Sequence, residues 1–425
     1  MTIETQDHIY VIGAGHAGGE LAFALRQQGY AGPLTVIGDE GHLPYQRPPL
    51  SKAYLKGEVE TPSLYLRQPA AYEKANISLI LSRRVERIDR ASKQLVFDDA
   101  RTVNYSKLAL ATGGRARRMT INDAARAERT RNFHYLRNID DVMAIRTRFE
   151  AGQRLIVIGG GYVGLEVAAS AIARGVQVTV LEALPRVLAR VTAPEMSAFY
   201  EQVHRNAGVD IRTGVEVTGL DFSADGELVS GVHTTGGVVL PADFVIVGIG
   251  LLPNTELAQA AGLSVDNGIV VDEYAVTSDP DIVAAGDCTS HPSAFCGRRI
   301  RLESVPNAVE QARTAAASLA GKPKSYDTVP WFWSDQYDLK LQMTGLSQGY
   351  DQFVLRGVMG NKSFTAFYLK DGRLIACDAV NRAQEFMVAK RMVAACKAFD
   401  PVALADETVP LKTLAGPVQA AAPPA

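Results

Sequence analysis

The chain has 425 residues, of which 47% are hydrophobic and 21% charged, and its formal net charge is −2. Such a composition is typical of an ordinary globular protein of about three domains and speaks against a strongly basic nucleic-acid-binding surface. The first residues lack the basic and apolar regions of a signal peptide, and no apolar run is long enough for a membrane helix, so we expect a cytoplasmic protein without nucleic-acid or membrane partners.

The first recognisable unit is an apolar strand at residues 9–12 followed by the glycines Gly13, Gly15 and Gly18. Gly13 allows a sharp turn, Gly15 lets the backbone approach a pyrophosphate, and Gly18 lets a helix pack closely on the strand. The next strand ends at an acid, Asp39, placed to bind an adenosine ribose. This spacing predicts a βαβ unit that binds a dinucleotide through the N-terminus of its helix.

A second copy of the pattern begins about 146 residues later, with the glycines Gly159, Gly161 and Gly164 and the acid Glu182. The chain is therefore predicted to bind two dinucleotides. An acid at the strand end repels a 2′-phosphate, which favours NAD over NADP. Arg186 and Arg190 leave the alternative open, because either could serve a 2′-phosphate.

Alternation of strands and helices predicts an α/β fold with two Rossmann-like dinucleotide-binding domains and a small C-terminal α+β domain. A sheet built from residues 1–118 alone would lack a terminal strand, and residues 282–286 supply a suitable apolar run. We therefore expect a discontinuous first domain. The predicted boundaries are residues 1–118 with 243–329 for the first domain, 119–242 for the second, 330–412 for the third and 413–425 for a disordered tail.

Cysteines and histidines indicate no metal site. The four cysteines form no Cys-x-x-Cys pair, and the seven histidines show no metal-ligand spacing. Cys288 and Cys296 are the nearest pair, and we do not expect them to form a functional disulfide. His16, inside the first glycine loop, is interpreted as filling the loop and not as a catalytic base.

Four further residues could be functional, and each also has a purely structural interpretation. Lys52 follows a proline pair at a possible helix start and could face a flavin ring, or it could be a surface lysine. Trp333 shares a strand face with Trp331 and could be functional or part of the core. Glu166 could be an acid favoured at a helix N-terminus, and Asp287 could be a helix N-cap.

Several of these motifs occur together in one order. They are Gly13-x-Gly15-x-x-Gly18, Arg47-Pro-Pro-Leu-Ser-Lys52, Ala111-Thr-Gly113-Gly114, Gly159-Gly-Gly161-Tyr-Val-Gly164-Leu-Glu166, Gly248-Ile-Gly250-Leu-Leu-Pro-Asn, Gly286-Asp287 and Pro330-Trp-Phe-Trp333. From Ile9 to about Lys412, the sequence resembles the FAD-dependent, NADH-dependent ferredoxin reductases of cytochrome P450 and other oxygenase systems. This family has a glutathione-reductase-like fold.

The resemblance implies a role for each matching residue. Lys52 would lie beside the isoalloxazine ring and pair with Glu166 near the nicotinamide, and Trp333 would cap the flavin. These three are the expected catalytic residues. The implied FAD site comprises Gly13, Gly15, His16, Ala17, Gly18, Asp39, Arg47, Lys52, Val85, Ala111, Thr112, Gly113, Arg137, Gly286, Asp287, Val305 and Trp333. The implied NADH site comprises Gly159, Gly161, Tyr162, Val163, Gly164, Glu166, Glu182, Arg190 and Gly250.

The resemblance also implies a reaction and a partner. NADH would pass a hydride to flavin N5, and single electrons would then leave for an acidic [2Fe-2S] ferredoxin. The ferredoxin would dock on basic residues, for which we nominate Arg67, Arg313, Lys340 and Lys390, and we expect the reductase to be a monomer. Three alternatives remain at this point: a disulfide reductase or thiol peroxidase, a flavin monooxygenase, and a slowly reduced flavin-binding signalling protein similar to apoptosis-inducing factor.

Overall fold

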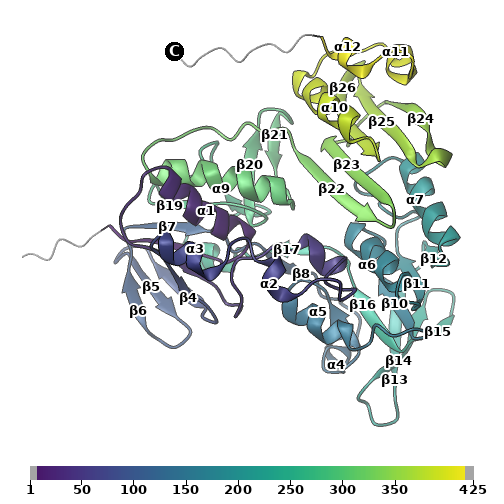
Figure 1. The fold of residues 1–425 in the computed structure, drawn as a ribbon. Coiled ribbons are helices and arrows are strands. Elements are labelled where there is room, and N and C mark those ends of the chain that lie inside the picture. Colours follow the sequence, from purple (N-terminus) through teal and green to yellow (C-terminus); the bar gives the residue numbers. More distant parts are fainter. Residues whose placement is uncertain (1–6, 417–425) are drawn as a thin grey trace, which may run out of the picture.

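The computed structural model describes residues 7–416 and divides into two sheet-centred nucleotide-binding regions and a C-terminal region (Figure 1). The tail predicted to be disordered, 413–425, lies partly outside these residues, at 417–425. Within the described part the prediction is wrong for 413–415, because these residues belong to helix α12 (Leu411–Ala415). Leu411 is buried against the C-terminal core, which stabilises this short helix.

The first region contains a parallel sheet in the order β19-β7-β1-β2-β3. Its central strand β1 (Ile9–Ile12) is fully buried and is followed by helix α1 (His16–Gln27). The other strands are β2 (Leu34–Ile37), β3 (Ile77–Ile80), β7 (Lys107–Leu110) and β19 (Ile282–Ala284). Helix α9 (Val305–Leu319) packs against α1. Residues that lie more than 170 positions apart in the sequence thus share one sheet and one helix layer.

The second region repeats this arrangement in a parallel sheet ordered β12-β11-β10-β16-β9. Its strands are β9 (Phe133–Tyr135), β10 (Arg154–Ile158), β11 (Gln177–Glu182), β12 (Asp210–Thr213) and β16 (Phe244–Val247), and helix α6 (Tyr162–Ile172) follows β10. The predicted boundary between residues 242 and 243 is wrong, because β16 pairs with β10 and β9 and belongs to the second sheet. A wholly apolar strand fits the centre of either sheet, so its own sequence did not reveal its partner.

Each sheet has an antiparallel three-stranded appendage at the corresponding point of the chain. In the first region it consists of β4 (Val85–Asp89), β5 (Gln94–Phe97) and β6 (Thr102–Asn104), and in the second of β13 (Val217–Phe222), β14 (Val229–Thr234) and β15 (Val239–Pro241). The chain crosses between the regions twice, at β8 (Gly114–Ala116) and β17 (Leu251–Pro253). These two strands pair antiparallel, which fastens the crossings to each other.

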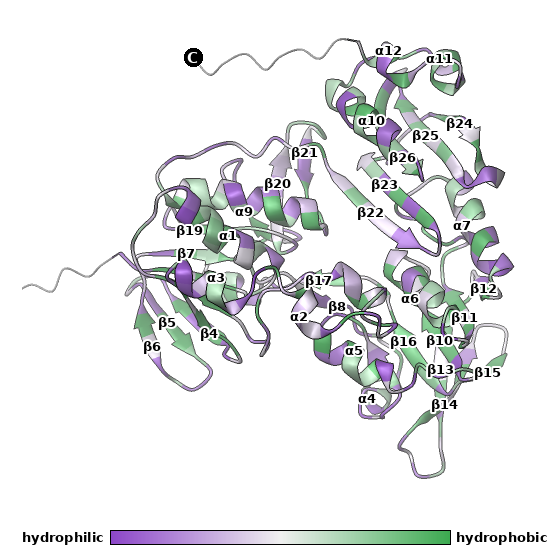
Figure 2. Cartoon of the chain, viewed as in Figure 1, coloured by the Kyte–Doolittle hydropathy of each residue, from purple (hydrophilic) through white to green (hydrophobic). Residues whose placement is uncertain are grey.

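The C-terminal region is an antiparallel sheet in the order β22-β23-β26-β25-β24. Its strands are β22 (Trp331–Gln336), β23 (Leu339–Gly345), β24 (Gln352–Val358), β25 (Ser363–Lys370) and β26 (Arg373–Val380), and its helices are α10 (Ala383–Ala395), α11 (Pro401–Ala405) and α12. Hydrophobic and hydrophilic residues are mixed along its strands and helices (Figure 2). Strand β22 also contacts α6 of the second region.

The remaining elements connect or cover these sheets. They are the 3-10 helices η1 (Pro48–Ser51) and η2 (Met359–Asn361), the helices α2 (Thr61–Leu64), α3 (Pro69–Lys74), α4 (Ala124–Ala127), α5 (Ile139–Arg146), α7 (Pro194–Asn206) and α8 (Glu256–Ala260), and the strands β18 (Ile269–Val270), β20 (Thr289–Ser293) and β21 (Arg298–Ile300). Among residues 7–416, no helix combines the length and the apolar character needed to cross a membrane.

Candidate functional site

The first glycine loop has the backbone that its spacing predicts. Gly13 has a φ of +114°, and a side chain there would overlap the carbonyl of Ala111. A side chain at Gly18 would overlap the carbonyl of Gly13, because α1 crosses the turn in direct contact. A Cβ added to Gly15 would meet no protein atom within 4 Å. The loop therefore leaves space for a ligand at the N-terminus of α1, where a phosphate is stabilised best.

The second glycine loop has the same construction. Gly159 has a φ of +112° and lies against the carbonyl of Gly248, Gly164 lies against the carbonyl of Gly159, and a Cβ on Gly161 would meet nothing within 4 Å. Glu182 ends β11 beside this loop. Its carboxylate accepts the backbone N–H of Gly160 at 2.7 Å and that of Leu184 at 2.8 Å.

Charged side chains surround the first loop. Arg47 pairs with Glu40 at 2.6 Å and donates to the carbonyl of Arg137 at 2.7 Å. Arg137 in turn pairs with Asp287 at 3.1 Å. Burial, reinforced by the nearby charge of Arg47, lowers the pKa of Arg137. Two guanidinium groups thus lie close together with one carboxylate each, an arrangement that an added anion would stabilise.

Unsatisfied polar atoms at the same place support this interpretation. Arg137 Nε and His16 Nδ1 are buried and have no hydrogen-bond partner among the described residues. Buried polar groups are normally paired, so each has the capacity to bind a further group. The residues of the first loop therefore fit the pyrophosphate of FAD. Burial lowers the pKa of His16, so this imidazole contributes no positive charge at neutral pH.

The other residues expected at the FAD site differ in burial and in their neighbours. Ala17 and Ala111 are buried beside the loop, and Gly286, with a φ of +88°, lies against Ala17. Thr112 and Asn254 exchange two hydrogen bonds across the domain crossing, next to Gly113. Val305 begins α9, whereas the side chain of Val85 is packed inside an apolar cluster. Asp39 is exposed.

The residues expected at the NADH site also differ in their surroundings. Val163 and Arg190 are exposed, and Gly250 has a φ of +111° at the domain crossing. The hydroxyl of Tyr162 lies 2.8 Å from the sulfur of Met343, and its ring packs on Phe332. Tyr162 therefore joins α6 to the C-terminal sheet as well as following the second glycine loop.

Lys52 and Glu166 meet between the two regions. Lys52 Nζ lies 2.6 Å from Glu166 Oε2, and the Ser51 hydroxyl donates to the same oxygen at 2.5 Å. The Ser334 hydroxyl donates to Oε1 at 2.6 Å. Glu166 is buried, and Lys52 retains one fifth of its side-chain exposure. Lys52 follows the short helix η1 (Pro48–Ser51), so the expectation of a helix start at Lys52 is wrong; the two prolines begin η1 instead.

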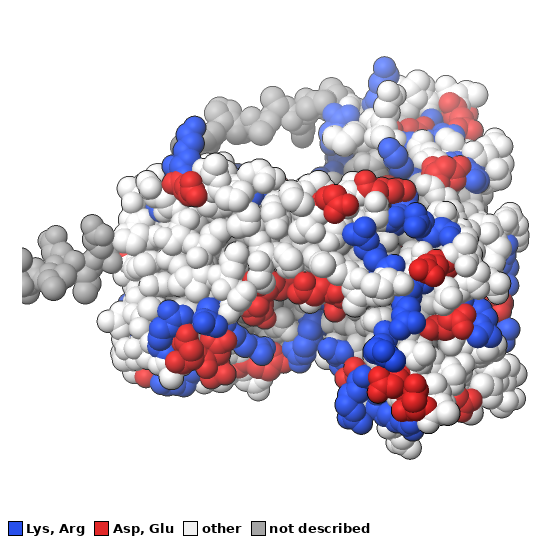
Figure 3. Space-filling model, turned by 60° about the horizontal axis from the view of Figure 1, so that its bottom comes forward, with Lys and Arg blue, Asp and Glu red and all other residues white. Residues whose placement is uncertain are grey.

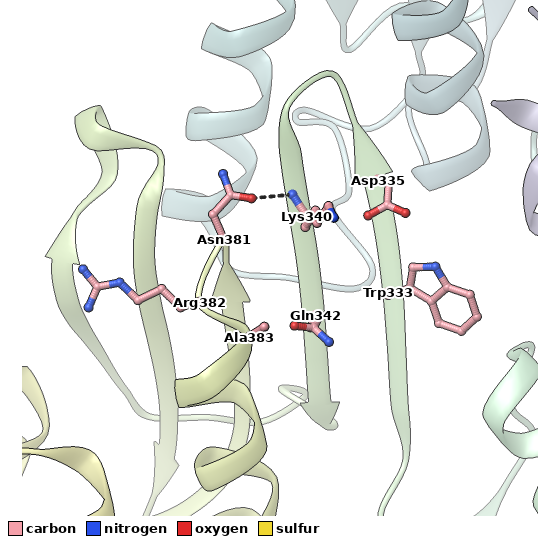
Figure 4. Close-up of a pocket in the computed structure, with 7 residues that line it drawn as sticks. All are labelled: Trp333, Asp335, Lys340, Gln342, Asn381, Arg382 and Ala383. Atoms are coloured by element: carbon pink, nitrogen blue, oxygen red, sulfur yellow. Dashed lines mark hydrogen bonds between the residues drawn. The ribbon is translucent and has the colours of Figure 1, made fainter. Parts of the chain in front are cut away.

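Trp333 lies half-buried on β22, with its ring centroid 5.7 Å from that of Trp331 on the same strand face. It lines a surface cavity of about 420 Å³ between β22, β23 and the start of α10 (Figure 4). The other lining residues are Asp335, Lys340, Gln342, Asn381, Arg382 and Ala383. Neither tryptophan is enclosed in the core, so both rings remain partly available to a ligand or partner.

The four nominated docking residues are not equally available. Arg67 is paired with Glu20 at 2.8 Å and lies over the ring of Phe23, and Arg313 is paired with Glu310 at 3.0 Å. Lys390 lies 4.8 Å from the ring centroid of Trp331. Lys340 is exposed at the rim of the cavity beside Trp333. Acidic and basic side chains are mixed on the face drawn in Figure 3.

Sequence reasoning missed several members of the site. Glu40 pairs with Arg47, and Gln311 accepts the N–H of Gly286 at 2.8 Å. Ser51 and Ser334 both bind Glu166. A signal existed for Glu40, which adjoins the predicted strand end, and for Ser51, which precedes Lys52 in the motif. None existed for Ser334, which lies 168 residues from Glu166.

The two glycine loops match each other, and the segments that follow them meet at one ion pair, Lys52–Glu166. This arrangement is typical of an oxidoreductase that brings two dinucleotides together. Residues 7–312 match the family model described as pyridine nucleotide-disulphide oxidoreductase, and residues 331–415 match the model described as reductase C-terminal. The chain belongs to this family, and within it to the ferredoxin reductases of oxygenase systems, which confirms the predicted fold class and the resemblance.

Two relatives and one solved structure support this assignment. Putidaredoxin reductase of Pseudomonas putida is 49% identical over 97% of each chain. The ferredoxin–NAD(+) reductase component of the anthranilate 1,2-dioxygenase system of Burkholderia cepacia is 42% identical over 96% of this chain and 99% of the relative. The reductase in a crystal structure of the covalent putidaredoxin reductase–putidaredoxin complex superposes with a TM-score of 0.93 at 49% identity, over 96% of this chain and 98% of that one.

Proposed function

We propose that this FAD-dependent ferredoxin reductase takes two electrons from NADH and passes them singly to a [2Fe-2S] ferredoxin that feeds a cytochrome P450 or another oxygenase. The observation that carries the proposal is the Lys52–Glu166 pair. Lys52 follows the first βαβ unit and Glu166 lies on the helix after the second glycine loop, yet they meet at 2.6 Å. Nucleotides bound to the two loops would therefore direct their reactive ends to one point.

The chain's own residues would position and tune this reaction. When bound, FAD accepts a hydride at N5 and releases electrons one at a time. Hydride transfer between stacked rings requires no protein nucleophile, so alignment is the main contribution of the two loops. The ammonium of Lys52 would favour negative charge on a neighbouring ring, and Trp333 would cover the ring and exclude water.

Disulfide chemistry, which the family description also names, is not part of the proposal. All four cysteines are free. Cys288 follows Asp287 in the site, but its thiol is buried and contacts the carbonyls of Leu110 and Ala285. Burial raises the pKa of Cys288, which keeps the thiol protonated and unreactive.

Anaerobic stopped-flow absorbance tests the first half-reaction. On mixing with NADH, the flavin absorbance should bleach within the turnover time of the enzyme. NADPH at the same concentration serves as the control for nucleotide choice. A flavin that stays oxidised, or that bleaches far more slowly than turnover, would contradict an electron-transfer role and favour a binding protein.

For the ferredoxin site, we propose the face that carries Trp331 and Trp333. Lys340 and Lys390 flank these rings, whereas Arg67 and Arg313 already have carboxylate partners. An acidic ferredoxin would gain more from the lysines, since neither forms an ion pair with another residue of 7–416. Charges at the rim of such an interface mainly raise the association rate.

Lys340→Glu tests this surface, with Lys397→Glu as the matched control because Lys397 is an exposed lysine of the same region. The reversal at Lys340 should raise the KM for ferredoxin about tenfold and weaken its dependence on ionic strength, while ferricyanide reduction by NADH stays unchanged. Equal effects of the two reversals would contradict docking at Trp331 and Trp333.

We further propose that the reductase works as a monomer in the cytoplasm. Free thiols fit a reducing compartment. The exposed large apolar side chains come from separate elements, such as Met143 on α5 and Met387 on α10. Light scattering of the FAD-loaded protein should give the mass of one chain, and a mass of two chains would overturn the monomer.

A further inference from the structure

A continuous chain of hydrogen bonds extends from Glu166 to the protein surface. Ser334 Oγ lies 2.6 Å from Glu166 Oε1, and Gln336 Nε2 lies 3.2 Å from Ser334 Oγ. Gln336 Oε1 is 2.8 Å from His204 Nε2, and the Tyr337 hydroxyl is 2.9 Å from His204 Nδ1. Only Tyr337, with 37% exposure, reaches solvent.

The members of this hydrogen-bond chain come from separate parts of the molecule. Glu166 lies on α6 and His204 on α7, both in the second nucleotide-binding region. Ser334 and Gln336 lie on β22 of the C-terminal sheet, two residues apart and therefore on one strand face. Ser334, Gln336 and His204 are each at most 2% exposed. The chain therefore crosses a buried interface between the two regions.

The donors in this chain all point toward Glu166. Burial lowers the pKa of His204 to about 4 and raises the pKa of Tyr337, so at neutral pH the imidazole is neutral and the phenol keeps its proton. Tyr337 then donates to Nδ1, which leaves the imidazole hydrogen on Nε2 to donate to Gln336 Oε1. The Gln336 amide donates to Ser334, whose hydroxyl is free to donate to Glu166.

The opposite orientation of the Gln336 amide would break the chain. Its oxygen would then accept from Ser334, and the hydroxyl of Ser334 could no longer donate to Glu166 Oε1. A buried carboxylate oxygen without a donor is costly, so the orientation described above is the stable one. Hydrogen bonds that share one direction also polarise and strengthen one another.

The carboxylate of Glu166 depends on this chain for its orientation. Its Oε2 atom accepts from Ser51 and pairs with Lys52. Its Oε1 atom is bound by Ser334. If that donor is lost, the carboxylate can rotate about its terminal bond, and the position of the Lys52 ammonium changes with it.

We propose that Ser334, Gln336 and His204 are positioning residues that hold the Glu166 carboxylate against Lys52 and so make hydride transfer depend on the C-terminal region. The inference rests on the proposed function, because it assigns Lys52 and Glu166 to the nicotinamide and flavin end of the site. Within residues 7–416, the hydrogen bonds of these three side chains lead to Glu166 and to neither glycine loop. Their effect is therefore transmitted through Glu166.

Ser334→Ala and Gln336→Leu test the proposal in the FAD-loaded protein. Each should slow the limiting rate of flavin reduction by NADH about tenfold, with the Kd for NADH changed less than about twofold, because positioning acts on the rate more than on binding. Tyr200→Phe is the matched control: Tyr200 lies one turn before His204 on α7, and its buried hydroxyl has no partner among the described residues.

A double-mutant cycle separates positioning from general damage. In a Glu166→Gln background, Ser334→Ala should slow reduction less than about twofold further, since the group that it positions has already changed. A full tenfold further loss, or no loss in the wild-type background, would overturn the proposal. If Gln336→Leu fails to fold, Tyr337→Phe removes the last donor at the exposed end and should give a smaller slowing of the same kind.

Two readouts do not depend on NADH. The flavin absorption maximum of Ser334→Ala should shift from that of the wild type, with Lys52→Met as the reference, because the first variant displaces the cation beside the ring and the second removes it. Histidine ¹⁵N resonances should show His204 as the Nε2–H tautomer, and an Nδ1–H tautomer would overturn the direction of the chain. If wild-type flavin is not reduced by NADH, the proposed function fails, while these two measurements still decide the positioning chain.

Discussion

The two nucleotide-binding regions have nearly the same backbone but different charged surroundings. Gly13 and Gly159 have φ values of +114° and +112°, and each follows the central strand of its five-stranded sheet. At the first loop, Arg47 and Arg137 lie half-buried, and Arg137 Nε and His16 Nδ1 have no hydrogen-bond partner among the described residues. At the second loop, the protein's own Glu182 accepts the nearby backbone N–H groups.

This difference suggests how one fold can hold one nucleotide and exchange another. The glycine geometry provides a phosphate site in both regions, so it does not distinguish them. The half-buried guanidinium groups at the first loop add attraction for an anion, which suits a resident cofactor. A carboxylate already satisfied by backbone N–H groups suits a substrate that must leave after each turnover. The predictions below test this distinction.

The largest effect should come from matched valine substitutions at Gly15 and Gly161. Their φ values are −83° and −80°, which any residue adopts, and neither Cβ would meet a protein atom within 4 Å. Both proteins should fold, and the new side chain should exclude a phosphate. Gly15→Val should weaken FAD binding at least about a hundredfold, and Gly161→Val should raise the KM for NADH by a similar factor.

The flavin-to-protein absorbance ratio after gel filtration measures the first effect, and steady-state kinetics with ferricyanide measures the second. Circular dichroism is the control for folding. If Gly161→Val also loses its flavin, the two loops do not have separate ligands, and the comparison above is wrong.

Local features of the site were predictable from sequence, and contacts between distant elements were not. Three glycines at fixed spacing after an apolar strand specify their own turn, so both loops were found. The pairing of Lys52 with Glu166 came only from the resemblance to a family, since 114 positions separate the two residues in the printed sequence. Ser334 and Gln336 read as ordinary polar residues of a strand, because their partners lie on α6 and α7.

Strand β16, which the sequence assigned to the wrong domain, shows that contacts between distant elements were also not predictable for the fold. Its residues, Phe244–Val247, are all buried, and such a run contains no alternation that marks one face. Only its register against Leu155–Ile158 and against β9 assigns it to the second sheet. Local periodicity identifies a buried strand but does not identify its neighbours.

A smaller effect should separate the acids at the two strand ends. Glu182→Gln removes the charge that repels a 2′-phosphate but keeps an oxygen that can accept the N–H of Gly160. The preference of the Glu182→Gln variant for NADH over NADPH, measured as the ratio of the two kcat/KM values, should fall about tenfold. Asp39→Asn makes the same change at the first loop and should leave that preference unaltered.

Both variants should retain their flavin, which serves as the control for folding. A change of nucleotide preference in Asp39→Asn would mean that the first loop also contacts NADH, contrary to the assignment of one nucleotide to each region. Adding Arg190→Ala to Glu182→Gln should reduce the gain with NADPH if this exposed arginine binds the 2′-phosphate.

The smallest effect concerns pH and distinguishes the edge strands of the two sheets. The second sheet ends at β9, which carries His134, whereas the corresponding strand β19 contains only Ile282, Val283 and Ala284. Burial, assisted by the charge of Arg148, lowers the pKa of His134 to about 4. The unfolded chain binds a proton below a pKa of about 6.5, and the folded chain binds it only near 4.

Because the unfolded state binds more protons in this window, acidification should weaken the second sheet as the pH falls from about 6.5 toward 4, with no effect above it. At a pH of about 5.8 the loss should be about 1 kcal/mol. Amide hydrogen exchange, corrected for its intrinsic pH dependence, should show that loss of protection in β9 but not in β19. His134→Gln should reduce it, because glutamine does not titrate, and His204, whose pKa is also lowered to about 4 by burial, accounts for the loss that remains. A wild-type loss of equal size in both edge strands would show that His134 is not its source, and the two sheets would then respond to acid alike.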